Sequence, residues 1–438
     1  MTTGHILLAI SICLIAGLIS NRLIKLVKLP NVTAYLIVGI LLGPYLFSLF
    51  SDKLPGVISK EMVDGLGIIV DIALGFIAFS IGSEFKLSSI KKLGKGIIVI
   101  TLFQSCMALV LVDLALLGFS FINGNVQENL PVILVLGAVA TATAPAATLM
   151  VIKQYKARGP LTETLLPVVA FDDAVGLILF SLSFSFAMVF AKQNAGIDGA
   201  TINMYNLICV PLIEIAISLA IGFTIGLLLT FGIRFFKSRA NRLMCMIACV
   251  FLGVALCNLF KTWFELEISS LLTCMMIGAV FCNIRNDALV ILDGIERWTP
   301  PIFMLFFILS GAELDFSVMK DVILICCVYL AARSVGKYVG AYIGCSISKT
   351  DSNVRKYLGL TLLPQAGVAI GMARSSSNSF RTLAETINYS TNGYSYLLSI
   401  GSTITAVVLC ATLVYELFGP VITKISLIKA GEIKKETN

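Results

Sequence analysis

Two adjacent carboxylates, Asp172 and Asp173, lie in the middle of a long apolar stretch. They are the only charged residues between Glu163 and Lys192. An ionised side chain at the centre of a bilayer costs about 2.5–3.5 kcal/mol on insertion scales, so such residues usually mark an ion or substrate pathway. Neighbouring residues on a helix diverge by roughly 100°, so the two acids face different surroundings and do not share a proton.

The sequence offers two bases that could compensate one of these acids. Arg333 and Lys337 lie inside another apolar stretch, four residues apart and therefore on one face of a helix. A pair between Asp172 and either base would satisfy both charges, and the sequence leaves open which base it is. Asp173 then remains to bind a small cation or a proton, since hard cations prefer oxygen ligands. A purely architectural salt bridge is the alternative, but it accounts for Asp172 alone.

Two apolar segments contain helix-breaking residues. One carries Pro145 between threonines Thr143 and Thr148, and the other carries Pro364, Gln365 and Gly367. Proline removes a backbone donor from a helix, and glycine lowers the cost of unwinding it. Ordinary kinks are one explanation. Breaks at corresponding places in two halves of a chain are instead typical of a transporter binding site.

Composition requires these elements to lie in a membrane. Hydrophobic residues make up 58% of the 438 residues and charged residues 13%, whereas soluble domains carry about 25% charged residues. A membrane-crossing helix needs about 20 apolar residues. We predict an all-α polytopic protein with about thirteen spans, the first retained and not cleaved as a signal peptide: 4–24, 31–50, 63–84, 93–120, 131–152, 161–192, 205–236, 241–261, 268–284, 298–318, 321–347, 354–376 and 392–420.

Basic residues fix the expected orientation. Of the 32 lysines and arginines, 23 fall in loops on one side, 7 on the other, and the remaining 2 are Arg333 and Lys337. Positive loops stay in the cytoplasm. We therefore expect the N-terminus to lie outside and the C-terminus to lie in the cytoplasm. We expect the protein to reside in the plasma or inner membrane.

The sequence also contains an internal repeat. Gly-Ser-Glu at 82–84 and Gly-Ala-Glu at 311–313 each close an aromatic-rich span, and the spans that follow keep nearly the same offset. The copies are seven spans apart, so they enter the membrane in opposite directions. This predicts two inverted five-helix repeats with crossed discontinuous helices, the layout of secondary transporters.

Four motifs resemble the monovalent cation:proton antiporter superfamily of sodium/hydrogen exchangers, specifically its paired-aspartate branch. The branch also contains the glutathione-gated potassium efflux transporters, whose cytoplasmic nucleotide-binding domain we do not expect here. The resemblance covers essentially the whole chain. The motifs are Thr-Ala-Pro-Ala-Ala-Thr at 143–148, Phe-Asp-Asp-Ala at 171–174, Gly-Lys-Tyr-Val-Gly-Ala at 336–341 and Leu-Pro-Gln-Ala-Gly-Val-Ala at 363–369.

The resemblance implies an elevator-type antiporter that forms a homodimer. It implies that Asp173 alternately binds a monovalent cation, Na⁺ or K⁺, and a proton, that Asp172 pairs with Lys337, and that the threonines Thr143 and Thr148 lie near the ion. The expected transport core comprises residues 63–192 and 298–420, and the dimerisation scaffold comprises residues 1–62 and 205–284. The spans make one transmembrane unit, 1–420, followed by a short basic tail, 421–438. Membrane lipids are the other expected partners; no cofactor and no nucleic acid are expected.

Three other functions fit the sequence less well than exchange. A sodium-coupled solute symporter could use the same repeat, but no polar cluster for an organic substrate is evident. An aspartyl protease needs carboxylates that face each other from different helices, which adjacent aspartates on one helix do not provide. A channel would need a symmetric ring of pore-lining residues, and the sequence has no such ring. We therefore predict a transporter and no enzyme, with Asp71, deep in the third span, as a residue along a candidate ion path.

Overall fold

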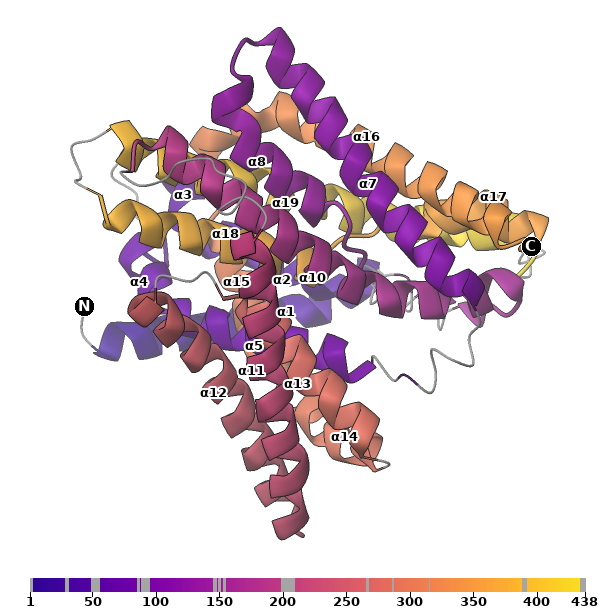
Figure 1. Ribbon diagram of the computed structural model, residues 1–438, viewed down its shortest axis with the longest axis horizontal. Helices are drawn as coiled ribbons and strands as arrows, with labels where there is room; N and C mark the ends of the chain where they lie inside the picture. The colour runs from indigo at the N-terminus through magenta and orange to yellow at the C-terminus, as the bar shows by residue number, and fades with distance from the viewer. Residues whose placement is uncertain are drawn as a thin grey trace. The chain divides into compact units, whose positions relative to one another are not determined.

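The computed structural model describes residues 3–27, 31–48, 56–84, 87, 95–144, 148, 151–152, 155–197, 209–264, 268–285, 287–314, 316–387 and 392–433. Regular structure within these ranges is helical throughout, as predicted (Figure 1). Among the described residues, seven helices are long and apolar enough to cross a membrane, and five shorter helices are apolar. The chain is therefore a multi-pass membrane protein.

The chain packs into two compact units. Unit 1 comprises residues 1–22, 35–92 and 204–313, and unit 2 comprises 23–34, 93–203 and 314–438. The predicted transport core placed 63–84 and 298–313 with the residues of unit 2, whereas packing groups them in unit 1. A division into moving and static regions is a functional one and stays a prediction.

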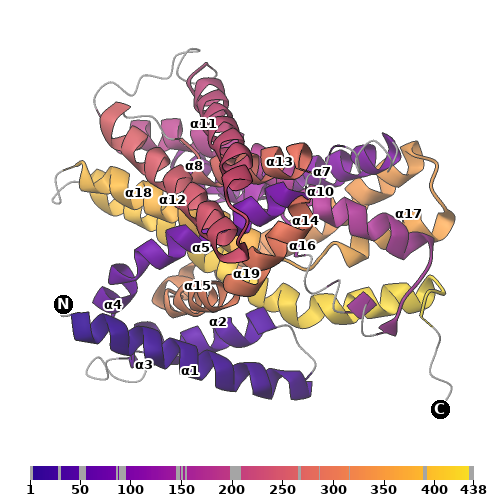
Figure 2. The ribbon, with the colours of Figure 1, turned by 90° about the horizontal axis from the view of Figure 1, so that it is seen from below.

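Unit 1 is organised around the apolar helix α13 (Ser270–Ile284). This helix packs against both α5 and α11, and α12 lies beside α11 (Figure 2). Asp71 lies half-buried in α5. The other helices are α1 (Thr3–Val27), α2 (Asn31–Leu42), α3 (Pro44–Ser48), α4 (Lys60–Gly65), α5 (Gly67–Glu84), α11 (Val210–Gly232), α12 (Arg239–Phe264), α14 (Ala288–Trp298) and α15 (Pro300–Ala312), the first two of which extend into unit 2.

One helix of unit 1 has no counterpart among the predicted spans. In α14, Ile291 and Ile295 are buried while Val290 is 73% exposed. Its polar side carries an ion pair between Arg297 and Asp293, 3.0 Å apart. One buried apolar side and one polar side are typical of a helix on a surface. Helix α14 is also too short to span a membrane, so a search for uniformly apolar segments misses this helix.

Unit 2 contains the predicted site segments. Its helices are α7 (Lys95–Ile122), α8 (Val126–Val139), α10 (Pro160–Asn194), α16 (Phe316–Ile347), α17 (Ser352–Thr361), α18 (Gly367–Glu385) and α19 (Asn392–Lys429). Helices α7 and α16, which correspond in the predicted repeat, lie side by side (Figure 1). A Cβ on Gly336, Gly340 or Gly344 would come within 2.6–2.8 Å of backbone atoms of α7. Glycine on α16 therefore permits near backbone contact along this seam.

The helix that carries the two aspartates begins against the end of the chain. Glu432 accepts hydrogen bonds from the backbone N–H of Leu161 and Thr162, at 2.5 and 2.9 Å, and from the Thr162 hydroxyl at 2.6 Å. The Glu432 carboxylate accepts from backbone N–H groups that have no partner within the helix, and its negative charge is stabilised by the positive end of the α10 dipole. Gly159, with φ +155°, precedes the helix, and a Cβ there would come within 2.6 Å of the Glu432 carboxylate. The expected tail thus includes a helical segment, 421–429, and a capping residue.

Candidate functional site

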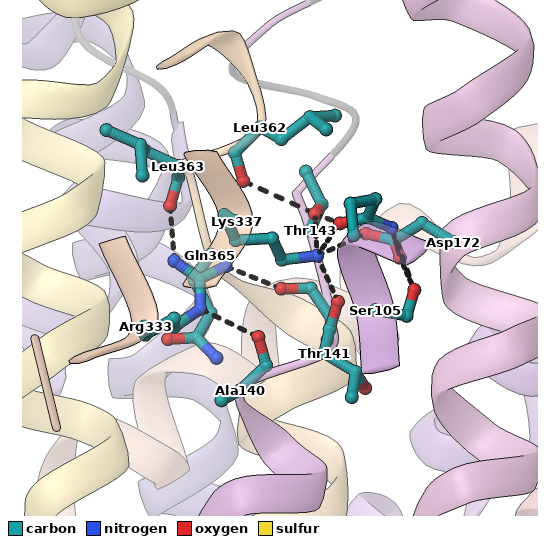
Figure 3. A network of polar contacts seen from close by, with 12 residues as sticks. Ser105, Ala140, Thr141, Thr143, Asp172, Arg333, Lys337, Leu362, Leu363 and Gln365 are labelled. Carbon is teal, nitrogen blue, oxygen red and sulfur yellow. Dashed lines mark hydrogen bonds and ion pairs between the residues drawn. The ribbon is translucent and has the colours of Figure 1, made fainter. Parts of the chain in front are cut away.

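A buried ion pair lies at the centre of unit 2. The Nζ of Lys337 on α16 is 2.8 Å from Oδ2 of Asp172 on α10, and both side chains are fully inaccessible (Figure 3). Such a pair persists in a low-dielectric interior only when further hydrogen bonds complete both groups. The ammonium also donates to Gln104 Oε1 at 2.6 Å, to Thr143 Oγ1 at 2.9 Å and to the carbonyl oxygen of Thr141.

The Asp172 carboxylate is equally well provided with donors. Its Oδ1 accepts from the Ser105 hydroxyl at 2.6 Å and from the Gln104 amide, both on α7. Its Oδ2 accepts from Thr143 as well as from Lys337. Both oxygens of Asp172 therefore have hydrogen-bond donors, and one of these donors is a cation.

Asp173 follows on the same helix and is also buried, at 4% exposed. The hydrogen bonds of the Lys337 ammonium described above go to Asp172 and its neighbours. The two aspartates therefore occupy different positions around α10, as their adjacency requires. Asp172 is the carboxylate that pairs with a base, and Asp173 is a second buried carboxylate next to it on the helix.

Two helix breaks meet next to this pair. Helix α8 ends at Val139, and residues 142–144 after it have no regular secondary structure. Helix α17 ends at Thr361, and α18 begins at Gly367. The backbone N–H of Ala144 donates to the carbonyl of Pro364 at 2.8 Å. The two breaks thus touch through the main chain, at corresponding positions of the predicted repeats.

Side chains also satisfy the carbonyl groups that the breaks release. The Arg333 guanidinium donates to Ala140 O at 3.0 Å and to Ala142 O and Leu363 O at 2.7 Å each (Figure 3). Its remaining face lies over the Tyr415 ring, 4.5 Å from the centroid. Arg333 therefore spans both breaks, and Lys337 is the base that pairs with Asp172.

Gln365 adds a second link between the breaks. Its Nε2 donates to Val139 O, the last residue of α8, at 3.0 Å. The same side chain exchanges hydrogen bonds with the buried hydroxyl of Tyr329 on α16. An uncharged amide at this position serves as both donor and acceptor, which a charged residue would not do.

The other predicted site residues have these positions. Thr143 bridges Lys337 and Asp172, while Thr148 donates to Thr361 O, the end of α17, at 3.3 Å. Gly367 is the first residue of α18. Asp71 belongs to unit 1, and Pro145 lies outside the described residues.

The polar residues of α7 that complete the site were not predicted from the sequence. Gln104 and Ser105 form an adjacent pair of buried polar residues within an apolar span, which was the available signal. The carbonyl oxygens of Ala140 and Thr141 were not predicted either, because no side-chain pattern reports where a backbone group is released.

Two helix breaks that meet beside buried charges are typical of a class, the secondary transporters with discontinuous helices. Comparison with known proteins makes this specific. The transmembrane sodium/hydrogen exchanger family matches residues 9–418, and the chain belongs to that family. Its members are transporters and not enzymes.

Individual relatives come from Methanocaldococcus jannaschii. A stretch of 205 residues is 25% identical to Na⁺/H⁺ antiporter 1, covering 46% of this chain and 44% of the relative. Two solved structures of the sodium proton antiporter MjNhaP1 share the fold. One, at pH 8, has a TM-score of 0.71 at 17% identity over 96% of this chain and 98% of the other, and the second, an electron-microscopy structure, has a TM-score of 0.70 at 15% identity over the full length of both.

Proposed function

We propose that this protein exchanges a monovalent cation, sodium in the first place, for protons across the membrane. The observation that carries the proposal is the fully buried Asp172–Lys337 pair, with Asp173 next to it, at the meeting point of two helix breaks. Family membership and the printed names of the relatives support sodium and protons as the transported ions. Potassium remains the second cation to test.

In this proposal Asp173 binds the cation and the proton in turn. A carboxylate at membrane depth that carries either a proton or a cation is neutralised in both states, which lowers the cost of moving it. Asp172 and Lys337 keep a balanced charge beside it, and protonation of Asp172 would release the lysine. Alternating access by an elevator movement of the site relative to a dimerisation scaffold completes the cycle.

The remaining features belong to the same proposal. The protein works as a homodimer in the plasma or inner membrane, with its N-terminus outside and its C-terminus in the cytoplasm. The asymmetry of basic loops supports this orientation. The sodium-coupled solute symporter is the competing proposal for the same fold.

Cation-induced proton flux in proteoliposomes tests the proposal. Liposomes with an acidic interior and a quenched pH dye receive sodium, potassium or lithium in turn, with the voltage clamped. We expect dequenching with the wild type and none with Asp173→Asn. The matched control is Glu385→Gln, which removes an exposed carboxylate from α18. Undiminished exchange by Asp173→Asn, or proton flux only when an organic solute is added, would overturn the assignment.

A further inference from the structure

Unit 2 contains another buried carboxylate that the exchange site does not use. Glu416 lies in the interior of α19 and is 1% exposed. Its one hydrogen bond among the described residues is a long one, 3.3 Å, accepted by Oε2 from the hydroxyl of Thr33 on α2. Asp172, by contrast, accepts hydrogen bonds from four donors, one of which is the Lys337 ammonium.

No cation among the described residues compensates Glu416. Helix α19 packs against α8, α10, α16, α17 and α18, which bring buried charged side chains into the interior of the unit. Lys337 is bound to Asp172, and Arg333 is bound to three carbonyls. Neither forms an ion pair with Glu416. The buried charged residues of these elements are Asp172, Asp173, Arg333, Lys337 and Arg374.

The same face of α19 carries an unused hydroxyl. Thr412 precedes Glu416 by one helical turn, is fully buried, and its Oγ1 has no hydrogen-bond partner among the described residues. An ionised carboxylate with one weak donor is strongly disfavoured relative to a neutral acid in such an interior. A protonated carboxyl group, in contrast, gains a donor of its own to offer to a hydroxyl oxygen.

We propose that Glu416 is a second proton-binding site of unit 2, where the carboxylate takes up one proton and becomes a neutral acid with Thr33 and Thr412 as its hydroxyl neighbours. The site is separate from Asp172 and Asp173, and it takes a proton without exchanging it for a metal cation. Its chain neighbour Tyr415 covers Arg333, the residue that spans both breaks. Loss of the proton at Glu416 would therefore leave a buried anion one residue along α19 from the tyrosine that contacts Arg333.

Infrared difference spectroscopy of the reconstituted protein tests this directly and requires no transport. We expect the wild-type-minus-Glu416→Gln spectrum at neutral pH to contain one carboxylic-acid C=O band that is absent from the wild-type-minus-Glu385→Gln spectrum. Absence of the band would overturn the proposal, because Glu416 would then be ionised.

A second variant keeps the test decisive if Glu416→Gln does not fold. Thr33→Val removes the hydroxyl that contacts Glu416 and should shift the frequency of the same C=O band. Thr423→Val, a buried hydroxyl two turns further along α19, should leave the band in place. A band that ignores Thr33→Val does not belong to Glu416.

A sodium titration separates a proton site from a cation site. In the Asp173→Asn background at constant pH, replacing choline chloride with sodium chloride should leave the Glu416 band unchanged. Loss of the band on addition of sodium would show that Glu416 exchanges its proton for a metal cation, and the inference would be wrong. A transport-inactive protein that retains the band would contradict only the proposed exchange function.

Discussion

Lys337 on α16 and Asp172 on α10 are 165 residues apart in sequence and form a fully buried ion pair with an N–O distance of 2.8 Å. Each partner compensates the buried charge of the other. Removing one partner should therefore cost more stability than removing both. Breaking a buried pair costs about 3–5 kcal/mol, whereas replacing both members can be nearly neutral.

Lys337→Gln should therefore destabilise the protein by about 3–5 kcal/mol. The isolated Asp172 carboxylate loses its cation and keeps only neutral donors. The double variant Asp172→Asn/Lys337→Gln should recover most of that loss, because an amide replaces the charge. Thermal unfolding in detergent measures both. Additive losses in the double variant would mean that the two residues do not stabilise each other.

Arg333→Lys should weaken the connection between the two breaks. The guanidinium holds three carbonyl oxygens at fixed positions, and a lysine ammonium lacks that planar fork. A hydrogen bond that involves a charged group contributes about 1.5–3 kcal/mol, so we expect a lower Tm and slower exchange. Arg381→Gln, in an exposed ion pair of α18, is the control and should stay within about 0.5 kcal/mol. Equal stability of the two variants would contradict the role of Arg333 in connecting the two breaks.

Glu432→Ala should loosen the start of α10. Loss of a helix cap costs about 1–2 kcal/mol, and here three hydrogen bonds disappear together. Hydrogen–deuterium exchange should increase at residues 161–164 before it increases elsewhere in α10. Glu432→Gln, which keeps one acceptor oxygen, should lie between the variant and the wild type. Unchanged protection at 161 and 162 would show that other groups cap this helix.

Asp287→Asn should change the response of the loop before α14 to acid. Hydrogen bonds from Arg285, at 2.7 and 2.6 Å, lower the pKa of Asp287 below its usual 3.8. A lowered folded-state pKa contributes stability above the unfolded pKa, and that stability is lost as the pH falls through the folded value. The effect is small because the Asp287 side chain is 44% exposed, so solvent screens the pair. Protection factors at 287–290, which correct for the intrinsic pH dependence of amide exchange, should fall between pH 6 and pH 3 in the wild type and stay constant in the variant. Parallel curves would refute the assignment.

Side-chain chemistry explains how much of this site was predictable. Uncompensated charges in apolar stretches identified Asp172, Asp173, Arg333 and Lys337 and required that acid and base meet. Which base pairs with Asp172 depends on how its helix is rotated about its axis and on where the helix breaks leave carbonyl groups without a backbone partner. Neither can be read from the local sequence. Arg333 found three carbonyl oxygens and Lys337 found the carboxylate, although both satisfy the same pattern.

Helix limits show the same distinction. The twelfth predicted span, 354–376, was one element with an interruption; the structure has α17 and α18 with residues 362–366 between them, and α18 continues to Glu385. Proline and glycine located the break, but the far end of α18 is amphipathic and lies outside a hydropathy threshold. The partner of the capping residue Glu432 could not be predicted either, since the contact spans about 270 residues.

That long contact bears on biosynthesis. Helix α10 leaves the ribosome with both aspartates long before residue 432 is translated, so its first amide groups must rely on water or lipid headgroups while the rest of the chain is inserted. The start of α10 is completed only when the last turns of α19 are in place. The start of the helix with the two acids therefore stays without these hydrogen bonds until about 270 further residues have been synthesised.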